Sequence, residues 1–319
     1  MAGVIALALV LGMSVASAVG RSVAVEETDL TSYGDVLEVH SSPDGSIVIS
    51  DYTAQELWLV DPGSDEYTVY DVGRVVDAKA DDDSVWWTDA AMTFGFLSIA
   101  SSEKETWTLS DEIDRYLYGT AFGEDGKVWF GEYFGARAKL YSFDPATTEL
   151  CTYALGSSAL SYGYYVLHGG GYFWMLNWGG GHVVRFDPAT LAVKRWDVGS
   201  MSALEQGMAL DSQGRLWWAD RAGEQLSRLD PTTGERADFI LPIGTDPVWV
   251  QIWGETVWYT ESAGGTVGIL DPQLASSSVS SLDAMNLTAT ESCSTLGPGT
   301  VEQVASTSDT VSWSADTLS

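Results

Sequence analysis

Short runs of apolar and aromatic residues, most of them closed by a carboxylate, recur along this chain and are separated by polar turn residues. The clearest copies, at 127–132 and 215–220, follow the turn dipeptides Asp125-Gly126 and Gln213-Gly214. Such dipeptides between β-rich runs indicate hairpins, because Gly adopts a positive φ without a Cβ penalty. Weaker copies lie at 44–51, 83–89, 169–177 and 254–261. The pattern predicts short antiparallel strands joined by tight turns.

A second turn, Asp-Pro-x-Thr, marks a fixed point of the repeat, with Pro presetting φ and Asp able to bond the following backbone. It begins at Asp144, Asp187 and Asp230, at steps of 43 residues, and a related Asp271-Pro272 follows after 41. A period of about 40–45 residues that contains short strands is typical of propeller blades. We therefore predict an all-β protein, a β-propeller with four-stranded antiparallel blades.

The repeat count predicts a ring of seven blades. Six whole repeats run from about residue 33 to residue 284, and the opening half of another lies at 297–316. Residues 22–31 resemble a lone outer strand, so strands from both termini would close the ring and leave no exposed edges between blades. This closing blade is one strand short. We expect either a three-stranded blade or a natural chain that continues beyond residue 319.

The N-terminus has the pattern of a secretory signal peptide. An apolar run at 4–15 is too short to span a bilayer, and it precedes an Ala16-Ser17-Ala18 cleavage pattern. The first residues contain no Lys or Arg, so a core strand is the alternative reading. We expect a signal peptide over 1–20, a single propeller domain over 21–319, and a secreted or cell-surface location without membrane insertion.

The charge of the chain excludes two classes of partner. With 45 acidic and 15 basic residues, the formal net charge is −30. Such a surface repels nucleic acid and anionic membranes, so we expect neither as a partner. The expected partner is a small molecule, a peptide or a carbohydrate, bound by a monomer.

The chain contains two cysteines. Cys151 falls on the outer strand of the third blade, and Cys293 falls in the linker before the seventh. On a seven-bladed ring these positions lie beyond disulfide reach. We therefore predict no disulfide and no metal bound by cysteine.

The topology places the residues that close the second strand of each blade on one face of the ring, called the top face below. These residues are Asp51, Asp89, Glu132, Asn177, Asp220, Glu261 and Asp316. Hard oxygen ligands in a concave mouth suit Mg²⁺ or Ca²⁺, and Glu132, Asp220 and Glu261 are the predicted metal ligands. The alternative is that each acid caps its own blade by accepting backbone N–H bonds, since repeats reproduce scaffold residues as readily as functional ones.

Of the three histidines, only His182 is expected on the top face, in the loop that follows the second strand of the fourth blade. Neutral imidazole suits the role of general base there, and an ordinary loop histidine is the alternative. The sequence has no G-x-S-x-G elbow, H-E-x-x-H motif, P-loop or Cys/His cluster. Serine hydrolase, zincin and nucleotide chemistry therefore have no support.

The repeat resembles that of the streptogramin B (virginiamycin B) lyase family of seven-bladed propellers. The fifth copy carries the resemblance, with Glu205-Gln206-Gly207-Met208, then Trp217-Trp218-Ala219-Asp220, then Leu226-Ser227-Arg228-Leu229-Asp230-Pro231-Thr232-Thr233-Gly234. The resemblance covers nearly all of residues 22–316. It implies Mg²⁺-dependent elimination at the ester of a cyclic depsipeptide, with a histidine as the base and a glutamate at the strand end.

This chain fills the family's glutamate position with Glu132, Asp220 and Glu261, and its histidine position with Tyr118, Tyr162 and Gln206. A phenol of ordinary pKa or an amide cannot replace imidazole as a base near neutral pH. We therefore predict a ligand-binding propeller, with ligand contacts from Tyr118, Tyr162, Gln206, Arg137 and Arg221. One alternative is a carbon–oxygen lyase that uses His182, Glu132 and Glu261 as catalytic residues. The other is a metal-dependent lactone hydrolase similar to the gluconolactonase-type propellers.

Overall fold

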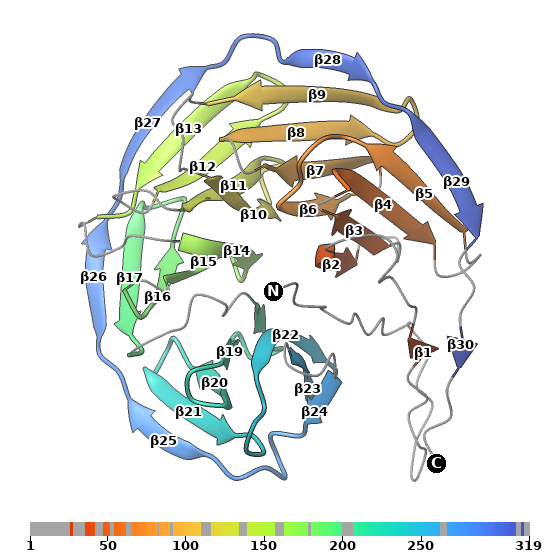
Figure 1. Cartoon of the computed structure of the whole chain (residues 1–319). Coiled ribbons are helices and arrows are strands. Elements are labelled where there is room, and N and C mark those ends of the chain that lie inside the picture. The colour runs from red at the N-terminus through yellow and green to blue at the C-terminus, as the bar shows by residue number, and fades with distance from the viewer. Residues whose placement is uncertain are drawn as a thin grey trace.

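Six antiparallel sheets stand around a common axis as the blades of a propeller (Figure 1). The computed structural model describes residues 26–27, 36–41, 47–51, 54–61, 66–81, 83–89, 92–109, 116–133, 139–156, 163–177, 180–199, 207–261, 267–310 and 314–315. Within these ranges the regular secondary structure consists of β-strands alone. The predicted all-β propeller is therefore confirmed, but the predicted number of seven blades is wrong, because the structure shows six.

The strands of a blade follow one another along the chain from the axis outward. Blade 1 contains β2 (Val36–Ser41), β3 (Ile47–Asp51), β4 (Glu56–Asp61) and β5 (Glu66–Asp71). Blade 2 contains β6 (Asp77–Ala80), β7 (Ser84–Thr88), β8 (Thr93–Ser98) and β9 (Glu103–Thr108). Blade 3 contains β10 (Tyr116–Phe122), β11 (Val128–Tyr133), β12 (Lys139–Asp144) and β13 (Glu149–Ala154).

The other three blades continue this order. Blade 4 contains β14 (Gly163–Gly169), β15 (Tyr172–Asn177), β16 (His182–Phe186) and β17 (Ala192–Asp197). Blade 5 contains β18 (Met208–Leu210), β19 (Leu216–Asp220), β20 (Gln225–Leu229) and β21 (Glu235–Ile240). Blade 6 has three strands instead of the predicted four, namely β22 (Pro247–Trp253), β23 (Thr256–Glu261) and β24 (Val267–Leu270).

Both predicted turns join the strands as expected. In the Asp-Pro turns the carboxylate accepts the backbone N–H two residues on, over 2.9 Å at Asp144, 2.9 Å at Asp187 and 2.8 Å at Asp230. Hydrogen bonds from the Thr147 hydroxyl and from the backbone lower the pKa of Asp144. In the hairpins between first and second strands, Gly126 and Gly214 adopt φ values of 77° and 74°, where a side chain would be strained.

Adjacent aromatic residues on the second strands explain how the blades pack. Side chains alternate between the two faces of a strand, so neighbouring aromatics face different blades. Trp217 packs with Phe239 and Val250 toward blade 6, whereas its neighbour Trp218 packs with Trp174 toward blade 4. Five buried clusters therefore fill the spaces between successive blades, and β19 is buried along its whole length.

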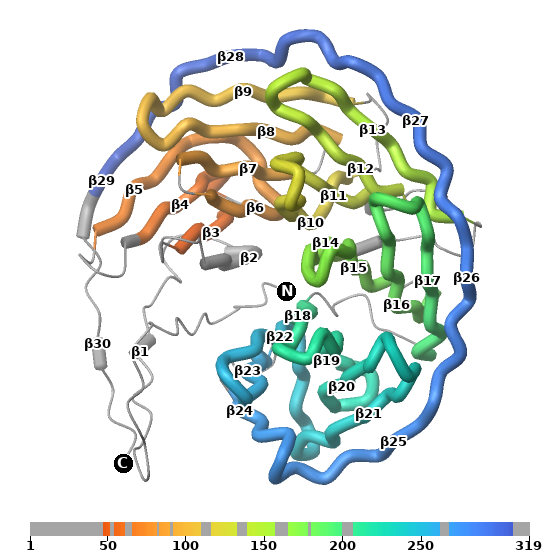
Figure 2. The backbone as a smooth tube through the Cα atoms, turned by 180° about the vertical axis from the view of Figure 1, so that it is seen from behind, coloured from red at the N-terminus to blue at the C-terminus, as the bar shows by residue number. Residues whose placement is uncertain are grey.

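The chain after blade 6 forms a belt around the outside of the ring, over residues 278–310. Its strands are β25 (Ser278–Ser281), β26 (Ala284–Thr288), β27 (Thr290–Thr295), β28 (Thr300–Gln303) and β29 (Ser306–Thr310). They pair in order with β21, β17, β13, β9 and β5, the outer strands of blades 5 to 1. The belt is the blue segment in Figures 1 and 2, and it gives each of these blades a fifth strand.

The belt uses residues that the sequence predicts to form part of a seventh blade. Residues 300–310 extend blades 2 and 1 instead, while β1 (Glu26–Glu27) and β30 (Ser314–Ala315) pair with each other beside the junction of blades 1 and 6 (Figure 1). A blade must bury both faces, and residues 300–310 offer few apolar side chains. The outer strands of the other blades, however, present unpaired N–H and C=O groups that any extended segment can satisfy.

The belt also brings Cys293 to Cys151, and a disulfide of 2.08 Å joins their sulfur atoms. The prediction that the two cysteines stay apart is wrong. The two residues are register partners on β27 and β13, with Cα atoms 4.0 Å apart. The prediction failed because it placed Cys293 in a linker to a seventh blade. The disulfide covalently fastens the belt to blade 3.

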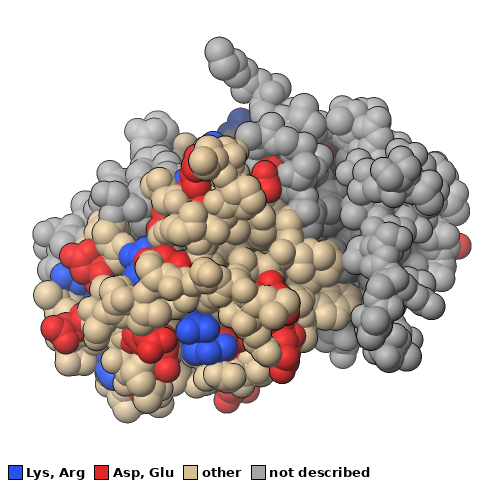
Figure 3. All heavy atoms as spheres, turned by 90° about the horizontal axis from the view of Figure 1, so that it is seen from below, with Lys and Arg blue, Asp and Glu red and all other residues tan. Residues whose placement is uncertain are grey.

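Acidic side chains are spread over the described part of the face seen from below (Figure 3). In the view from below, Asp and Glu lie scattered among other residues, and Lys and Arg lie beside them (Figure 3). Within the described parts of the chain, no helix is long and apolar enough to cross a membrane.

Candidate functional site

Polar residues close the second strands of the blades, as the sequence predicted. Second strands run in the same direction relative to the axis, so their last residues lie on the top face. A polar residue stands at or near the end of each second strand: Asp51 in β3, Glu132 in β11, Asn177 in β15, Asp220 in β19 and Glu261 in β23. In blade 2, Asp89 directly follows β7. Four predicted site residues, Asp316, Arg137, Tyr162 and Gln206, lie outside the described residues.

Three of these strand-end residues cap the loop that follows them. The side-chain Oδ1 accepts the backbone N–H three residues later, from Ala54 to Asp51 over 2.7 Å, from Gly180 to Asn177 over 2.8 Å and from Gly223 to Asp220 over 3.1 Å. The same bond recurs in blades 1, 4 and 5, although the residue in blade 4 is an amide. Capping is therefore a structural role of this position, which was the alternative to a ligand role.

Asp220 has a further set of partners inside blade 5. Its Oδ2 accepts hydrogen bonds from Gln225 Nε2 at 2.8 Å and from Arg236 Nη2 at 3.1 Å. Arg236 is itself held by Asp238, whose Oδ1 lies 2.7 Å from Arg236 Nε. The carboxylate of Asp220 is 7 % exposed, so its charge is stabilised by this internal network rather than by solvent.

Glu132 is stabilised differently, by residues of the next strand in its own blade. It is 1 % exposed, and its Oε2 accepts a hydrogen bond of 2.6 Å from the Tyr141 hydroxyl. The ammonium of Lys139 lies 3.3 Å from the same oxygen. A buried carboxylate needs such a counter-charge, because its desolvation is otherwise costly. Glu132 thus forms a compact acid–phenol–ammonium group near the top of blade 3.

His182 opens β16 and is the register partner of Asn177, so it lies at the top-face end of blade 4. The side chain is 7 % exposed, and its Nδ1 has no hydrogen-bond partner within the described residues. Burial and the neighbouring Arg195 lower the pKa of His182, and Asp197 offsets part of this effect. The imidazole is therefore neutral at pH 7 and can accept a proton. Its predicted catalytic role stays a prediction.

The lowered pKa of His182 predicts a pH-dependent stability. Below the ordinary histidine pKa of about 6.5, the unfolded chain binds a proton that the folded imidazole resists. Unfolding therefore becomes more favourable as the pH falls through this range. Urea unfolding between pH 7 and pH 5 should show a smaller loss of stability in His182→Gln than in the unmodified protein. The same pH dependence in both proteins would contradict the prediction.

Two other predicted contacts lie at the rim. Arg221, which follows β19, makes a bidentate ion pair with Asp246, which precedes β22, so the pair joins blades 5 and 6. Their side chains are 25 % and 20 % exposed and remain within reach of a ligand. Tyr118 lies on β10 with 5 % exposure, opposite Gly131 on β11. The ligand-binding roles of Arg221 and Tyr118 stay predictions.

Sequence reasoning missed a lysine–aromatic cluster from the inner strands of alternate blades. The Lys79 ammonium of blade 2 lies 4.7 Å from the ring centroid of Tyr165 in blade 4. That ring lies 5.1 Å from the ring of Trp249 in blade 6. Contacts among three alternate blades are possible only near the axis. The height of the cluster along the axis follows from Trp249, which is the register partner of Thr260, one residue from Glu261. The cluster therefore lies near the axis, close to the level of the top face.

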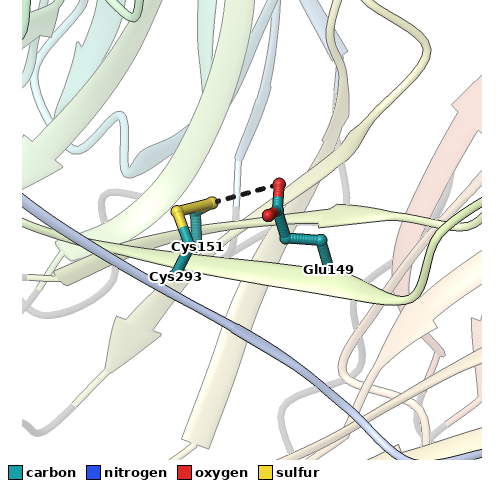
Figure 4. Close-up of side chains that lie close together, drawn as sticks. All are labelled: Glu149, Cys151 and Cys293. Carbon is teal, nitrogen blue, oxygen red and sulfur yellow. Dashed lines mark hydrogen bonds between the residues drawn. A yellow bond between two sulfur atoms is a disulfide. The ribbon is translucent and has the colours of Figure 1, made fainter.

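The predicted metal ligands do not form a close set. Within the described residues, one group of three potential ligand atoms from His, Cys, Asp or Glu lies within 4.8 Å, and its members are Glu149, Cys151 and Cys293 (Figure 4). Its two sulfur atoms are joined to each other, and the Glu149 carboxylate lies 3.8 Å from the Cys151 sulfur. The carboxylates of Glu132, Asp220 and Glu261 make no such group. The Mg²⁺ or Ca²⁺ site on the top face stays a prediction.

Comparison with known proteins gives similarity in structure alone. No family model and no curated protein sequence matches the chain. A virginiamycin B lyase from Staphylococcus aureus superposes with a TM-score of 0.67 at 18% identity, over 79% of this chain and 87% of the lyase. A streptogramin B lyase gives 0.66 at 18% identity, over 78% of this chain and 83% of that chain.

A protein of another kind is also similar. The hydrazine synthase of Kuenenia stuttgartiensis superposes with a TM-score of 0.54 at 12% identity, over 78% of this chain and 89% of that chain. The propeller fold therefore does not by itself identify a function, which must be argued from the site. At these identities the comparisons establish the architecture: the chain is a β-propeller similar in fold to the streptogramin B lyases.

Proposed function

We propose that this protein is a secreted propeller that binds a small molecule, peptide or carbohydrate on its top face without converting it. The observation that carries the proposal is the use of the strand-end residues. Asp51, Asn177 and Asp220 each cap their own loop, and Glu132 is bound to Tyr141 and Lys139. The oxygen atoms that make these bonds are less available to a divalent metal or for proton transfer, and the second oxygen of Asp51, Oδ2, has no hydrogen-bond partner within the described residues.

The lysine–aromatic cluster supports binding. Pockets that hold small ligands are lined by aromatic and apolar side chains with a few placed polar groups. Trp249 supplies a half-buried ring near the axis that packs against the buried ring of Tyr165, while Lys79 supplies a cation that also donates to the carbonyl of Thr120. Arg221 and Asp246 supply partly exposed charges at the rim. This combination fits a ligand with an apolar or aromatic part and a polar substituent.

Secretion is supported by the disulfide between Cys151 and Cys293. Disulfides persist in oxidising compartments and are rare in reducing cytosol. The apolar run at 4–15 and the Ala16-Ser17-Ala18 pattern point to the same compartment. Both observations come from separate parts of the chain and agree.

The proposal is tested by separating binding from turnover. One of the similar structures is a catalytically inactive histidine-to-alanine variant of the Staphylococcus aureus lyase with quinupristin, at a TM-score of 0.64 and 17% identity. We would incubate the present protein with quinupristin, simple lactones and oligosaccharides, with and without Mg²⁺ or Ca²⁺. We expect saturable binding of at least one compound, weakened in Trp249→Ala, and no product by mass spectrometry. Metal-dependent product formation would contradict the proposal.

His182 favours a second candidate function, a lyase acting on a cyclic ester. A buried neutral imidazole whose Nδ1 has no partner within the described residues has the protonation state of a general base. Under this reading, His182→Ala abolishes quinupristin turnover, whereas His168→Ala, at the opposite end of β14 from the top face, leaves it unchanged. Turnover that survives in His182→Ala would exclude His182 as the base.

A further inference from the structure

A small cavity lies between blades 5 and 6, at the hairpin turns on the face opposite the top face. Its volume is about 190 Å³. Its walls come from the turn after β18, from β20, from the β22–β23 hairpin and from the residues after β24. Water occupies about 30 Å³ per molecule, so the cavity has room for about six waters or for one small organic molecule. It is smaller than the sites that hold drug-sized ligands.

The charges around this cavity are unequally compensated. Asp211 accepts hydrogen bonds from Arg215 Nε at 2.7 Å and from Trp217 Nε1 at 2.9 Å. Burial alone would raise the pKa of Asp211, but these bonds together lower it, so it stays ionised and neutralises Arg215. At the mouth, Glu255 accepts a hydrogen bond of 2.8 Å from Gln273. Arg215 is therefore paired closely with Asp211, whereas Arg228 has no carboxylate partner at so short a distance.

Arg228 has a weak carboxylate partner. The side chain is 15 % exposed, and in its ion pair the carboxylate oxygen of the half-exposed Glu235 lies 3.4 Å from its Nη2. The guanidinium carbon lies 5.4 Å from the ring centroid of Trp217 and 5.7 Å from that of Phe239. Burial and, after it, the nearby Arg215 lower the pKa of Arg228, and the charges of Glu235, Asp211 and Asp230 offset only part of this effect. A guanidinium in this setting gains from a planar anion that it can bind with two N–H groups.

We propose that this cavity binds a small monocarboxylate, with its carboxylate on Arg228 and its short hydrocarbon chain against Ile252, Val257 and Pro272. The apolar part of the wall favours a hydrocarbon chain over a bare inorganic ion. Only one positive charge in the wall is poorly compensated, and Asp211 and Glu255 repel a second negative charge. A doubly charged phosphate is therefore disfavoured. The site is independent of the proposed function of the top face.

The test is calorimetric titration with sodium butyrate at constant ionic strength, with sodium phosphate and sodium chloride in parallel. We expect saturable butyrate binding, weaker phosphate binding and no effect of chloride. Removing one charge-assisted hydrogen bond costs about 1.5–3 kcal/mol, so Arg228→Gln should weaken butyrate binding roughly tenfold or more. Arg185→Gln is the matched control, because Arg185 is the register partner of Trp174 in blade 4 as Arg228 is of Trp217 in blade 5, and Arg185 does not line the cavity. It should bind butyrate as the unmodified protein does.

A second variant keeps the test independent of the stability of Arg228→Gln. Ser212 is exposed at the rim of the cavity, so Ser212→Trp should block entry without disturbing the packing of Arg228 on Trp217. We expect it to abolish butyrate binding. Unsaturable butyrate heats, equal binding in Ser212→Trp, or phosphate binding as tight as butyrate binding would overturn the proposal.

Discussion

Reduction of the Cys151–Cys293 disulfide should lower the free energy of unfolding by about 2–5 kcal/mol. The bond joins residues separated by 142 positions, so it closes a very long loop and removes many conformations from the unfolded chain. The belt that it fastens buries few side chains, since β25, β27 and β28 expose all of theirs. Ala289 and Val304 are the buried belt residues within the described part. Backbone hydrogen bonds to the outer strands supply most of the remaining attachment.

The measurement is urea unfolding of the oxidised and reduced protein, together with hydrogen exchange of the β27 amides. Exchange at Thr290–Thr295 should accelerate more than exchange in β11, because the belt can separate without opening the blades. The variant Cys151→Ser/Cys293→Ser serves as the control, since a reductant should not change its stability. Equal unfolding curves for the oxidised and reduced protein would show that the belt is held without the disulfide.

Asp220→Ala should lower the free energy of unfolding by about 3 kcal/mol. The substitution removes the acceptor for Gly223 N–H and leaves Arg236, whose side chain is 11 % exposed, with one carboxylate partner fewer. Breaking a buried ion pair on one side typically costs 3–5 kcal/mol. Asp238 still contacts Arg236 at 2.7 Å, so the expected loss of stability lies at the lower end of this range.

Asp220→Asn separates the two parts of this effect. The amide can still accept the Gly223 N–H, as Asn177 does for Gly180 in blade 4, but it cannot compensate the charge of Arg236. We therefore expect it to recover about 1 kcal/mol relative to Asp220→Ala. Urea unfolding measures both values. Glu302→Gln, at an exposed carboxylate that pairs with Lys104, is the control and should change stability little. A stable Asp220→Ala variant would leave the ligand role as the better explanation of this residue.

Much of the blade could be predicted from the sequence because its determinants are local. An Asp-Pro turn needs the Asp carboxylate to reach an N–H only two residues away, and the structure contains this bond at Asp144, Asp187, Asp230 and Asp271. The Asp-Gly and Gln-Gly hairpins likewise depend on one backbone conformation at Gly126 and Gly214. For the same reason the sequence correctly placed the polar residues that close the second strands.

The roles of these strand-end residues needed the tertiary structure. The sequence shows Glu132 and Asp220 at equivalent points of two repeats, yet one is bound to Tyr141 and Lys139 and the other to Gln225 and Arg236. Position within a repeat determines where a side chain lies, whereas its partners depend on neighbouring strands that vary from blade to blade. The lysine–aromatic cluster was missed for a related reason, because its three members come from separate repeats.

By itself, the sequence determined the repeat, its turns and the alternation of buried side chains, because each depends on residues close together in the chain. Only the tertiary structure decided the number of blades, the course of the belt and the disulfide. The belt pairs by backbone hydrogen bonds with most of its side chains exposed, and backbone groups are nearly the same at every residue. A polar strand therefore carries little in its sequence to specify its partner, and Cys293 lies beside Cys151 because β27 pairs with the outer strand of blade 3.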